Sequence, residues 1–341
     1  MSSLRAALAK DGFVIQRQIL SASELASLRA AAARTTTRAR EGNWPDVRTV
    51  GKQFPPWPAP DPAGTPPPTG IWGVQGLLNP ALGDDAAVFA ASYFHERVLG
   101  VAKALLTYEG DGGDGEEGVE ECTDDDLVLE LYNMLVRPES DFELEWHRDD
   151  VPSTATPEQE AKKLGIKPPP AASSSINGES ESNGMKGNGN GSVSNKKRYW
   201  NTQWNLALFP DDSLIVVPGS HIRVRTQAER AASPREAHMP NQLVVRLEPG
   251  DVVFYDNNIL HRGVYRANKE RMSLHGSVGH AGGGRFRATN VLQHGIGKWV
   301  DRCDFSALDG GEERRRRAEG MRARLVKLGR ESGDVGYSLA G

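Results

Sequence analysis

Short runs in which apolar residues dominate or alternate with polar ones fill the middle of the chain. Alternation with a period of two is typical of half-buried β-strands, and continuous apolar runs are typical of strands buried on both faces. Turn-forming glycine, proline, aspartate and asparagine residues separate several of the runs. The runs predicted as strands are 127–136, 142–146, 202–209, 213–217, 242–247, 252–255 and 271–278. Several short strands joined by tight turns predict a barrel or a sandwich.

Helical patterns flank this β-rich region. Ser21 and Glu24 fit a capping box, in which each side chain satisfies the other residue's free backbone N–H group. Near the C-terminus, apolar residues at i, i+4 and i+7 from Met321 predict a basic helix over 309–332. The arginine run 314–317 is expected to be a solvated face of that helix rather than an RNA-binding strip.

Three segments are expected to lie outside the packed core of a single domain spanning 1–341. Residues 55–68 hold eight prolines and are predicted as an extended surface loop, because proline cannot donate a backbone hydrogen bond. Residues 109–126 are predicted as a mobile acidic insertion, since their carboxylates repel one another. Residues 152–197 include a Ser/Gly/Asn tract and are predicted as a low-complexity, disordered insertion.

Charge and cysteine usage limit the partners. Lys plus Arg number 41 and Asp plus Glu 45, a formal net charge of −4, so the chain lacks the basic field that attracts nucleic acid or an anionic membrane. Cys122 and Cys303 are the only cysteines, which excludes a disulfide scaffold and fits a reducing compartment. With no signal-peptide pattern and no long apolar run, the expected location is the cytoplasm.

A histidine and an aspartate two residues apart mark the candidate chemistry. In extended backbone, His147 and Asp149 point to the same side of a sheet. A Pro-Gly-Asp turn at 249–251 opens an apolar strand, and His261 follows it. If this hairpin packs across a small barrel from the first strand, the three side chains meet. Two histidines and one carboxylate on one face form the Fe(II) site of non-haem oxygenases, which leaves positions open for a cosubstrate and dioxygen.

Arg271 and Ser273 repeat the two-residue spacing ten residues after His261. A guanidinium and a hydroxyl on one strand face suit a carboxylate partner. With the iron holding the 2-oxo acid end of 2-oxoglutarate, this pair is predicted to bind the distal carboxylate of the same molecule.

These motifs together resemble the phytanoyl-CoA dioxygenase family of Fe(II)/2-oxoglutarate-dependent oxygenases, and look like those of a fungal member. The resemblance is carried by Asp11-Gly12-Phe13-Val14, His147-Arg148-Asp149, Pro218-Gly219-Ser220-His221, and His261 with Arg271-x-Ser273. It implies a mainly β fold with flanking helices (α+β), namely a double-stranded β-helix of the jelly-roll or cupin-like kind. It also implies that the protein uses Fe(II), 2-oxoglutarate and O2 to hydroxylate an unactivated C–H bond, releasing succinate and CO2.

The sequence departs from the family at one turn. Members often have an Asn-Gly pair before the strand that leads to the Pro-Gly-Ser-His motif, whereas this chain reads Pro210-Asp211-Asp212. That turn is expected to differ in shape.

Several further residues are candidates for the site, and two of them have an alternative structural interpretation. The resemblance places Asn133 against 2-oxoglutarate, although a strand asparagine can equally end a ladder. Trp204 either walls the cosubstrate pocket or packs in the core. Trp72 lies where the family builds its substrate mouth, together with the nearby Gln75, and His275 is expected to point inward by parity. The other histidines, His294 among them, are expected to be structural.

The expected partner is a small-molecule substrate, and the sequence leaves the oligomeric state open. Phytanoyl-CoA itself is disfavoured, because residues 338–341 do not match the Ser-Lys-Leu peroxisomal address. The alternative function is a non-catalytic, cupin-like barrel that binds a metal or a ligand, against which the Arg271 and Ser273 pair argues. A second alternative is an interaction scaffold that works through the insertions.

Overall fold

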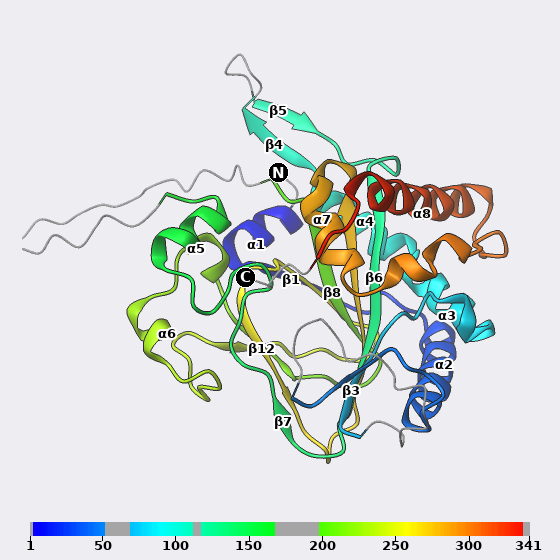
Figure 1. The fold of residues 1–341 in the computed structure, drawn as a ribbon, viewed down its shortest axis with the longest axis horizontal. Helices are drawn as coiled ribbons and strands as arrows, with labels where there is room; N and C mark the ends of the chain where they lie inside the picture. Colours follow the sequence, from blue (N-terminus) through cyan, green and yellow to red (C-terminus); the bar gives the residue numbers. More distant parts are fainter. Residues whose placement is uncertain (1–2, 52–68, 112–116, 168–197, 337–341) are drawn as a thin grey trace, which may run out of the picture.

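The computed structural model describes residues 3–51, 69–111, 117–167 and 198–336, and its elements are labelled in Figure 1. The α-helices are α1 (Ser3–Asp11), α2 (Ala22–Arg40), α3 (Asp84–Tyr93), α4 (Glu96–Leu106), α5 (Pro157–Leu164), α6 (Gln227–Ala231), α7 (Gly284–Leu292) and α8 (Glu312–Ser332). The strands are β1 (Phe13–Gln16), β2 (Val47–Thr49), β3 (Ile71–Val74), β4 (Tyr108–Asp111), β5 (Glu117–Glu120), β6 (Leu127–Val136), β7 (Phe142–Glu143), β8 (Asn201–Ala207), β9 (Leu214–Val217), β10 (Leu243–Val244), β11 (Val252–Tyr255), β12 (Leu260–Tyr265) and β13 (Met272–His280).

Two antiparallel sheets form the body of the protein. The large sheet has the order β1-β11-β8-β13-β6-β3-β2, and the small sheet has the order β10-β9-β12-β7. From β6 to β13 the chain passes repeatedly between the sheets, so strands that follow one another in sequence mostly lie in different sheets. The order β11-β8-β13-β6 facing β10-β9-β12-β7 is that of a double-stranded β-helix. The α+β fold class predicted from the sequence is therefore confirmed.

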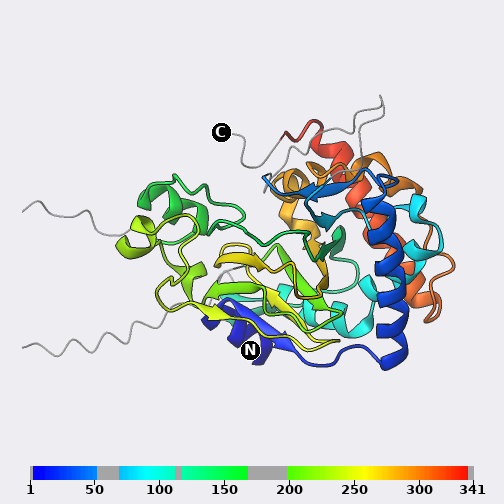
Figure 2. The ribbon, with the colours of Figure 1, turned by 90° about the horizontal axis from the view of Figure 1, so that it is seen from below.

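Helices cover the outer face of the large sheet. In Figure 1 and in the turned view of Figure 2, α2 and α8 lie on the side of the molecule away from α5 and α6. The main hydrophobic core fills the space between these helices and the sheet, where the Tyr93 ring of α3 lies 5.6 Å from that of Trp204 on β8. Between the two sheets lie a smaller hydrophobic cluster, which includes Val216 of β9 and Val253 of β11, and a cavity.

The predicted strands are confirmed, with one error of topology. Strand β6 has the predicted bounds, while β7 and β10 are shorter than expected. The turn at 249–251, β11 and His261 do not form one hairpin as predicted. Strand β11 pairs with β8 in the large sheet, whereas β12 pairs with β9 in the small sheet. Residues 256–259 cross between the sheets, and the hydrophobic pattern of the two strands does not distinguish a crossing from a hairpin.

Two of the segments predicted to be irregular contain regular structure. Helix α5 lies within the predicted disordered stretch 152–197, and a Thr156–Gln159 capping box together with Pro157 at its start explains it. Strands β4 and β5 pair antiparallel over 108–111 and 117–120, which overlaps the predicted insertion 109–126. Residues 168–197 and the proline-rich residues 55–68 lie outside the described parts of the chain.

The predicted helices are present at both ends of the chain, but the arginine run 314–317 is not a fully solvated face. Ser21 and Glu24 form the predicted capping box at the start of α2, and Met321 is fully buried in α8. Arg317 is also buried, contrary to the expectation of a solvated face, because it pairs with Glu96 at 2.7 Å and with a second acidic side chain. Among the described residues, no helix has both the length and the apolar character needed to cross a membrane.

Candidate functional site

Three side chains predicted from the sequence meet between the sheets. Nε2 of His147 lies 3.6 Å from Oδ1 of Asp149, and Nε2 of His261 lies 3.8 Å from the same oxygen. All three donor atoms fall within 4.8 Å of one another. The histidines do not meet across the barrel as predicted, however. They are direct neighbours, because each donates its backbone N–H to the other's carbonyl oxygen at 3.0 Å in a β-bridge.

Both histidines are held in the form that a metal requires. Nδ1 of His147 lies 2.7 Å from the carbonyl of Glu145, and Nδ1 of His261 lies 2.8 Å from the carbonyl of Ile259. A carbonyl only accepts, so each Nδ1 carries the proton and each Nε2 keeps its lone pair. Burial lowers the pKa of both imidazoles to about 4. They are therefore neutral at pH 7.

The carboxylate of Asp149 is oriented by a residue that the sequence reasoning missed. Nε2 of Gln203 donates to Oδ2 of Asp149 at 2.8 Å, which leaves Oδ1 for the metal position. Burial raises the pKa of Asp149, while His147 and the Gln203 hydrogen bond act in the opposite direction. Gln203 precedes Trp204 on β8, so the two side chains point to opposite faces of the sheet, but the sequence does not say which face is inside.

A buried arginine between two of the proposed ligands fixes the surrounding loops. Arg148 donates to the backbone carbonyls of Ser220 at 2.9 Å, Arg223 at 3.1 Å, and Asn258. Its Nε lies 3.0 Å from Glu160 of α5, which is fully buried and also binds two other arginines. These contacts hold the loop that carries His147 and Asp149 against the segment that leads into β12.

The Pro-Gly-Ser-His motif contributes to the same framework. Oγ of Ser220 accepts the N–H of Leu260 at 2.7 Å, next to His261. Gly219 adopts a φ of 71°, a conformation that favours glycine. His221 is fully buried and does not line the cavity. The motif therefore supports the site without touching it.

A cavity of about 160 Å³ adjoins the three side chains. Trp72 and His275 line it, as expected, and so do His294 and Arg48, to which the sequence analysis assigned no functional role. Nδ1 of His275 lies 2.8 Å from Oδ1 of Asn205, which places the proton on Nδ1. Burial lowers the pKa of His275 to about 3, so this ring presents a neutral acceptor.

Arg271 lines the cavity, but Ser273 does not. Nε of Arg271 donates to Oδ2 of Asp211 at 3.1 Å, and Oγ of Ser273 donates to the same oxygen. Ser273 has no exposed surface, and its hydroxyl, predicted to bind a cosubstrate, is bonded to Asp211 in this structure. The guanidinium of Arg271 stacks over the ring of Tyr265 at 4.3 Å, and its Nη1 is buried without a hydrogen-bond partner among the described residues.

Asp211 lies in the turn where the chain departs from the family. Burial opposes its ionisation, but Arg271, Ser213 and Ser273 together hold the pKa of Asp211 below its usual value. The carboxylate is therefore the anionic partner that holds Arg271, through its Nε.

Two other residues predicted to contact 2-oxoglutarate, Trp204 and Asn133, do not line this cavity. Trp204 points to the helices, where it packs in the main core, while its neighbours Gln203 and Asn205 line the cavity. The core-packing alternative for Trp204 is therefore the correct one. Asn133 accepts the N–H of Gly76 at 3.0 Å and borders a separate cavity of about 10 Å³ with Gln75.

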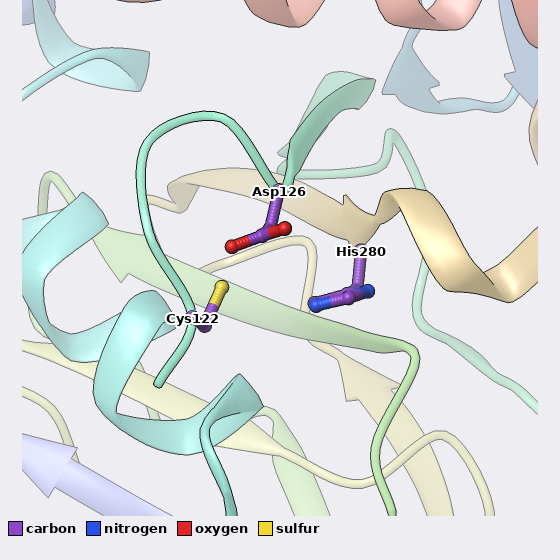
Figure 3. A group of neighbouring side chains, drawn as sticks. All are labelled: Cys122, Asp126 and His280. Carbon is purple, nitrogen blue, oxygen red and sulfur yellow. The ribbon is translucent and has the colours of Figure 1, made fainter. Parts of the chain in front are cut away.

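A second group of metal-binding residue types lies on the outside of the barrel. Cys122, Asp126 and His280 bring donor atoms within 4.8 Å of one another (Figure 3). Nδ1 of His280 accepts the N–H of Gly282 at 3.0 Å, so the ring proton is on Nε2 and neither nitrogen offers a lone pair. Burial raises the pKa of the Cys122 thiol to about 12. Nδ1 of His280 is thus already used within the chain, and no metal is assigned to this group.

Comparisons with known proteins give limited similarity. No family model matches the chain, and no curated protein matches it. Among solved structures, AviO1 from Streptomyces viridochromogenes is 18% identical with a TM-score of 0.47, over 82% of this chain and 94% of that one. EctD from S. alaskensis, with 2-oxoglutarate and 5-hydroxyectoine, is 16% identical with a TM-score of 0.49, over 83% of this chain and 77% of EctD. HygX from Streptomyces hygroscopicus, with nickel and 2-oxoglutarate bound, is 18% identical with a TM-score of 0.45, over 82% of this chain and 87% of HygX.

Likeness at this level of identity does not reach beyond the fold. The class of protein is defined by the strand order and by the site. It is a double-stranded β-helix that carries two neutral histidines and one carboxylate between its sheets.

Proposed function

We propose that the protein is an Fe(II)/2-oxoglutarate-dependent dioxygenase of the phytanoyl-CoA dioxygenase kind. The observation that carries this proposal is the convergence of the ligand atoms of His147, Asp149 and His261, all within 4.8 Å of one another, beside a cavity that Arg271 also lines. Two imidazoles and one carboxylate on one face suit Fe(II) and leave coordination positions open. The Arg271 guanidinium suits a carboxylate.

The residues of this chain have distinct roles in the proposal. His147, Asp149 and His261 would hold Fe(II), which with 2-oxoglutarate and O2 supplies the oxidising power to hydroxylate a C–H bond, yielding succinate and CO2. Arg271 binds the distal carboxylate of 2-oxoglutarate through the Nη1 atom that lacks a partner among the described residues. Asp211 holds that guanidinium in place from the opposite end.

The substrate is proposed to be a small molecule, turned over in the cytoplasm. Both cysteines are buried free thiols, which fits a reducing compartment. The proposal of a fungal origin rests on the sequence motifs alone.

One observation favours the alternative of a non-catalytic binding barrel. Asp211 already accepts hydrogen bonds from Nε of Arg271 and from the hydroxyl of Ser273. Of the pair predicted to bind the distal carboxylate of 2-oxoglutarate, only the Nη end of Arg271 remains. A barrel that binds a metal without 2-oxoglutarate would have the same pairing. The two functions differ in whether 2-oxoglutarate is consumed.

Succinate release tests the proposal. The protein is loaded anaerobically with Fe(II), mixed with 2-oxoglutarate and exposed to air, and succinate is measured without any added substrate. Slow succinate formation is expected, with none from the Asp149→Ala variant. His238→Ala, which removes an exposed imidazole outside the site, serves as the matched control and should behave as the wild type. Iron-loaded protein that forms no succinate would establish the binding barrel instead.

A further inference from the structure

Part of the cavity wall consists of side chains that hydrogen-bond to one another around Asp150. Nδ2 of Asn290 donates to Oδ1 of Asp150 at 2.8 Å, and Nδ2 of Asn258 donates to its Oδ2 at 3.2 Å. Nδ2 of Asn201 donates to Oδ1 of Asn257 at 3.0 Å. Asp150 directly follows the proposed ligand Asp149, so this polar wall adjoins the metal position.

Helix α7 supplies the outer half of the wall. Arg287 and Asn290 are three residues apart and therefore neighbours on one helix face, and both line the cavity. Arg287 is buried and forms a two-point ion pair with Glu130 of β6, with Nε at 2.9 Å and Nη2 at 2.6 Å. This pair fixes the guanidinium and neutralises its charge.

Two polar atoms on this face lack a hydrogen-bond partner among the described residues. Within the described parts of the chain, Nη1 of Arg287 and Oδ1 of Asn290 are buried and make no hydrogen bond. One is a donor and the other is an acceptor. Buried polar atoms in proteins are almost always hydrogen-bonded, so an unpaired donor and an unpaired acceptor beside one cavity indicate a ligand.

The chemistry of the wall restricts that ligand. A hydroxyl group both donates and accepts, and therefore suits a face that offers Nη1 of Arg287 beside Oδ1 of Asn290. The carboxylate of Asp150 disfavours a carboxylate ligand, and because the charge of Arg287 is already paired with Glu130, its Nη1 offers a hydrogen bond rather than an unpaired charge. An acyl chain would leave both atoms unsatisfied. The amides of Asn201 and Asn257 extend the neutral, hydrogen-bonding character of the wall.

We infer that the primary substrate is a neutral, polyhydroxylated compound of the sugar or glycoside class, whose hydroxyl groups bind Arg287 and Asn290 of α7. This inference rests on the proposed function, because it takes the cavity beside the three metal-binding side chains as the reaction site. It goes further by assigning substrate recognition to α7.

A panel of probes tests the substrate class on the iron-loaded protein. The probes are methyl glycosides and inositol, zwitterionic amino acids, and medium-chain fatty acids. The first measurement is the anaerobic visible absorption band of Fe(II) with 2-oxoglutarate, and the second is succinate release in air with each probe. Methyl glycosides or inositol are expected to accelerate succinate release.

Variants of α7 test the assignment. Asn290→Leu should raise the KM for an active glycoside about tenfold, as the loss of one hydrogen bond predicts, while Asn290→Ser, which keeps a donor and an acceptor, should raise it less. The KM for the cosubstrate 2-oxoglutarate is the internal reference, and thermal melting verifies the fold. Thr289→Ala is the matched control, since the Thr289 hydroxyl bonds Arg285 within the helix.

The outcomes separate the two proposals. Absence of the absorption band before any probe is added removes the proposed function and the inference with it. A normal band with acceleration only by fatty acids or amino acids, or with none by any polyhydroxylated probe, overturns the substrate class alone. An unchanged glycoside KM in Asn290→Leu overturns the role of α7.

Discussion

Replacing Asp211 by asparagine should weaken the fold and the predicted cosubstrate site together. Oδ2 of Asp211 accepts from Nε of Arg271 at 3.1 Å and from the hydroxyl of Ser273, while Oδ1 accepts the N–H of Ser213 at 2.9 Å. In Asp211→Asn, with Oδ1 kept on Ser213, an NH2 group replaces Oδ2. Nε–H of Arg271 and the hydroxyl of Ser273 then both point at an NH2 group, which is itself a donor. The guanidinium of Arg271 also loses its only acidic partner among the described residues.

The magnitude follows from burial. The side chains of Arg271 and Asp211 are 7% and 6% exposed, so solvent cannot replace the lost partner. Removing one member of a buried ion pair typically costs about 3–5 kcal/mol, which is a large part of the roughly 5–15 kcal/mol by which folded domains are stable. A guanidinium released from Asp211 is also less well placed for 2-oxoglutarate, so the KM for 2-oxoglutarate should rise.

Urea unfolding of the metal-free protein measures the first effect, and succinate release at varied 2-oxoglutarate measures the second. Asp212→Asn is the matched control, because the neighbouring Asp212 pairs with Lys269 at the surface with 49% of its side chain exposed. Exposed pairs contribute about 1 kcal/mol or less. If Asp211→Asn unfolds at the same urea concentration as Asp212→Asn and keeps the wild-type KM, the assignment of Asp211 as the support of Arg271 is refuted.

Three further predictions concern the proposed iron site and the Cys122 group. Gln203→Leu should weaken Fe(II) binding by about 10-fold to 100-fold in chelator competition, because Asp149 loses its orienting hydrogen bond; an unchanged affinity would contradict this. His261 stays neutral in the fold down to about pH 4 but is protonated below about pH 6.5 when unfolded, so it stabilises the fold above pH 6.5 and this contribution is lost as pH falls towards 4. The unfolding free energy of metal-free His261→Gln should therefore depend on pH less steeply than that of the wild type, by about 1.4 kcal/mol per pH unit in this window, and identical slopes would refute the reasoning. Cys122→Ser should leave the number of bound Co(II) ions unchanged, with no thiolate absorption band in either protein, since His280 offers no lone pair; loss of a bound ion would show a second site.

Local patterns in the sequence determined most of the strands and the three proposed ligands. Strand bounds such as those of β6 follow from runs of apolar residues, and the shared face of His147 and Asp149 follows from the two-residue period of extended backbone. The start of α2 follows from its capping box. These features depend on residues close together in the chain, so spacing alone contains the information.

Period and parity do not say which face of a strand is inside. Trp204 and Gln203 are adjacent on β8, and only the packing of helices against the large sheet decides that the tryptophan faces the core and the glutamine faces Asp149. The sequence also does not show which strands pair. His261 was therefore predicted on the far side of a barrel, whereas it is the direct neighbour of His147.

Contacts between distant residues were decided by the tertiary structure alone. Asp211 and Arg271 are 60 positions apart, and Arg287 and Glu130 are 157 apart. The sequence shows charged residues at these positions but not which of them pair, because pairing depends on how the two sheets and α7 are brought together. A buried charge must find its partner wherever the fold places one, and for that reason the wall of the cavity, unlike the three proposed metal ligands, could be described only from the folded chain.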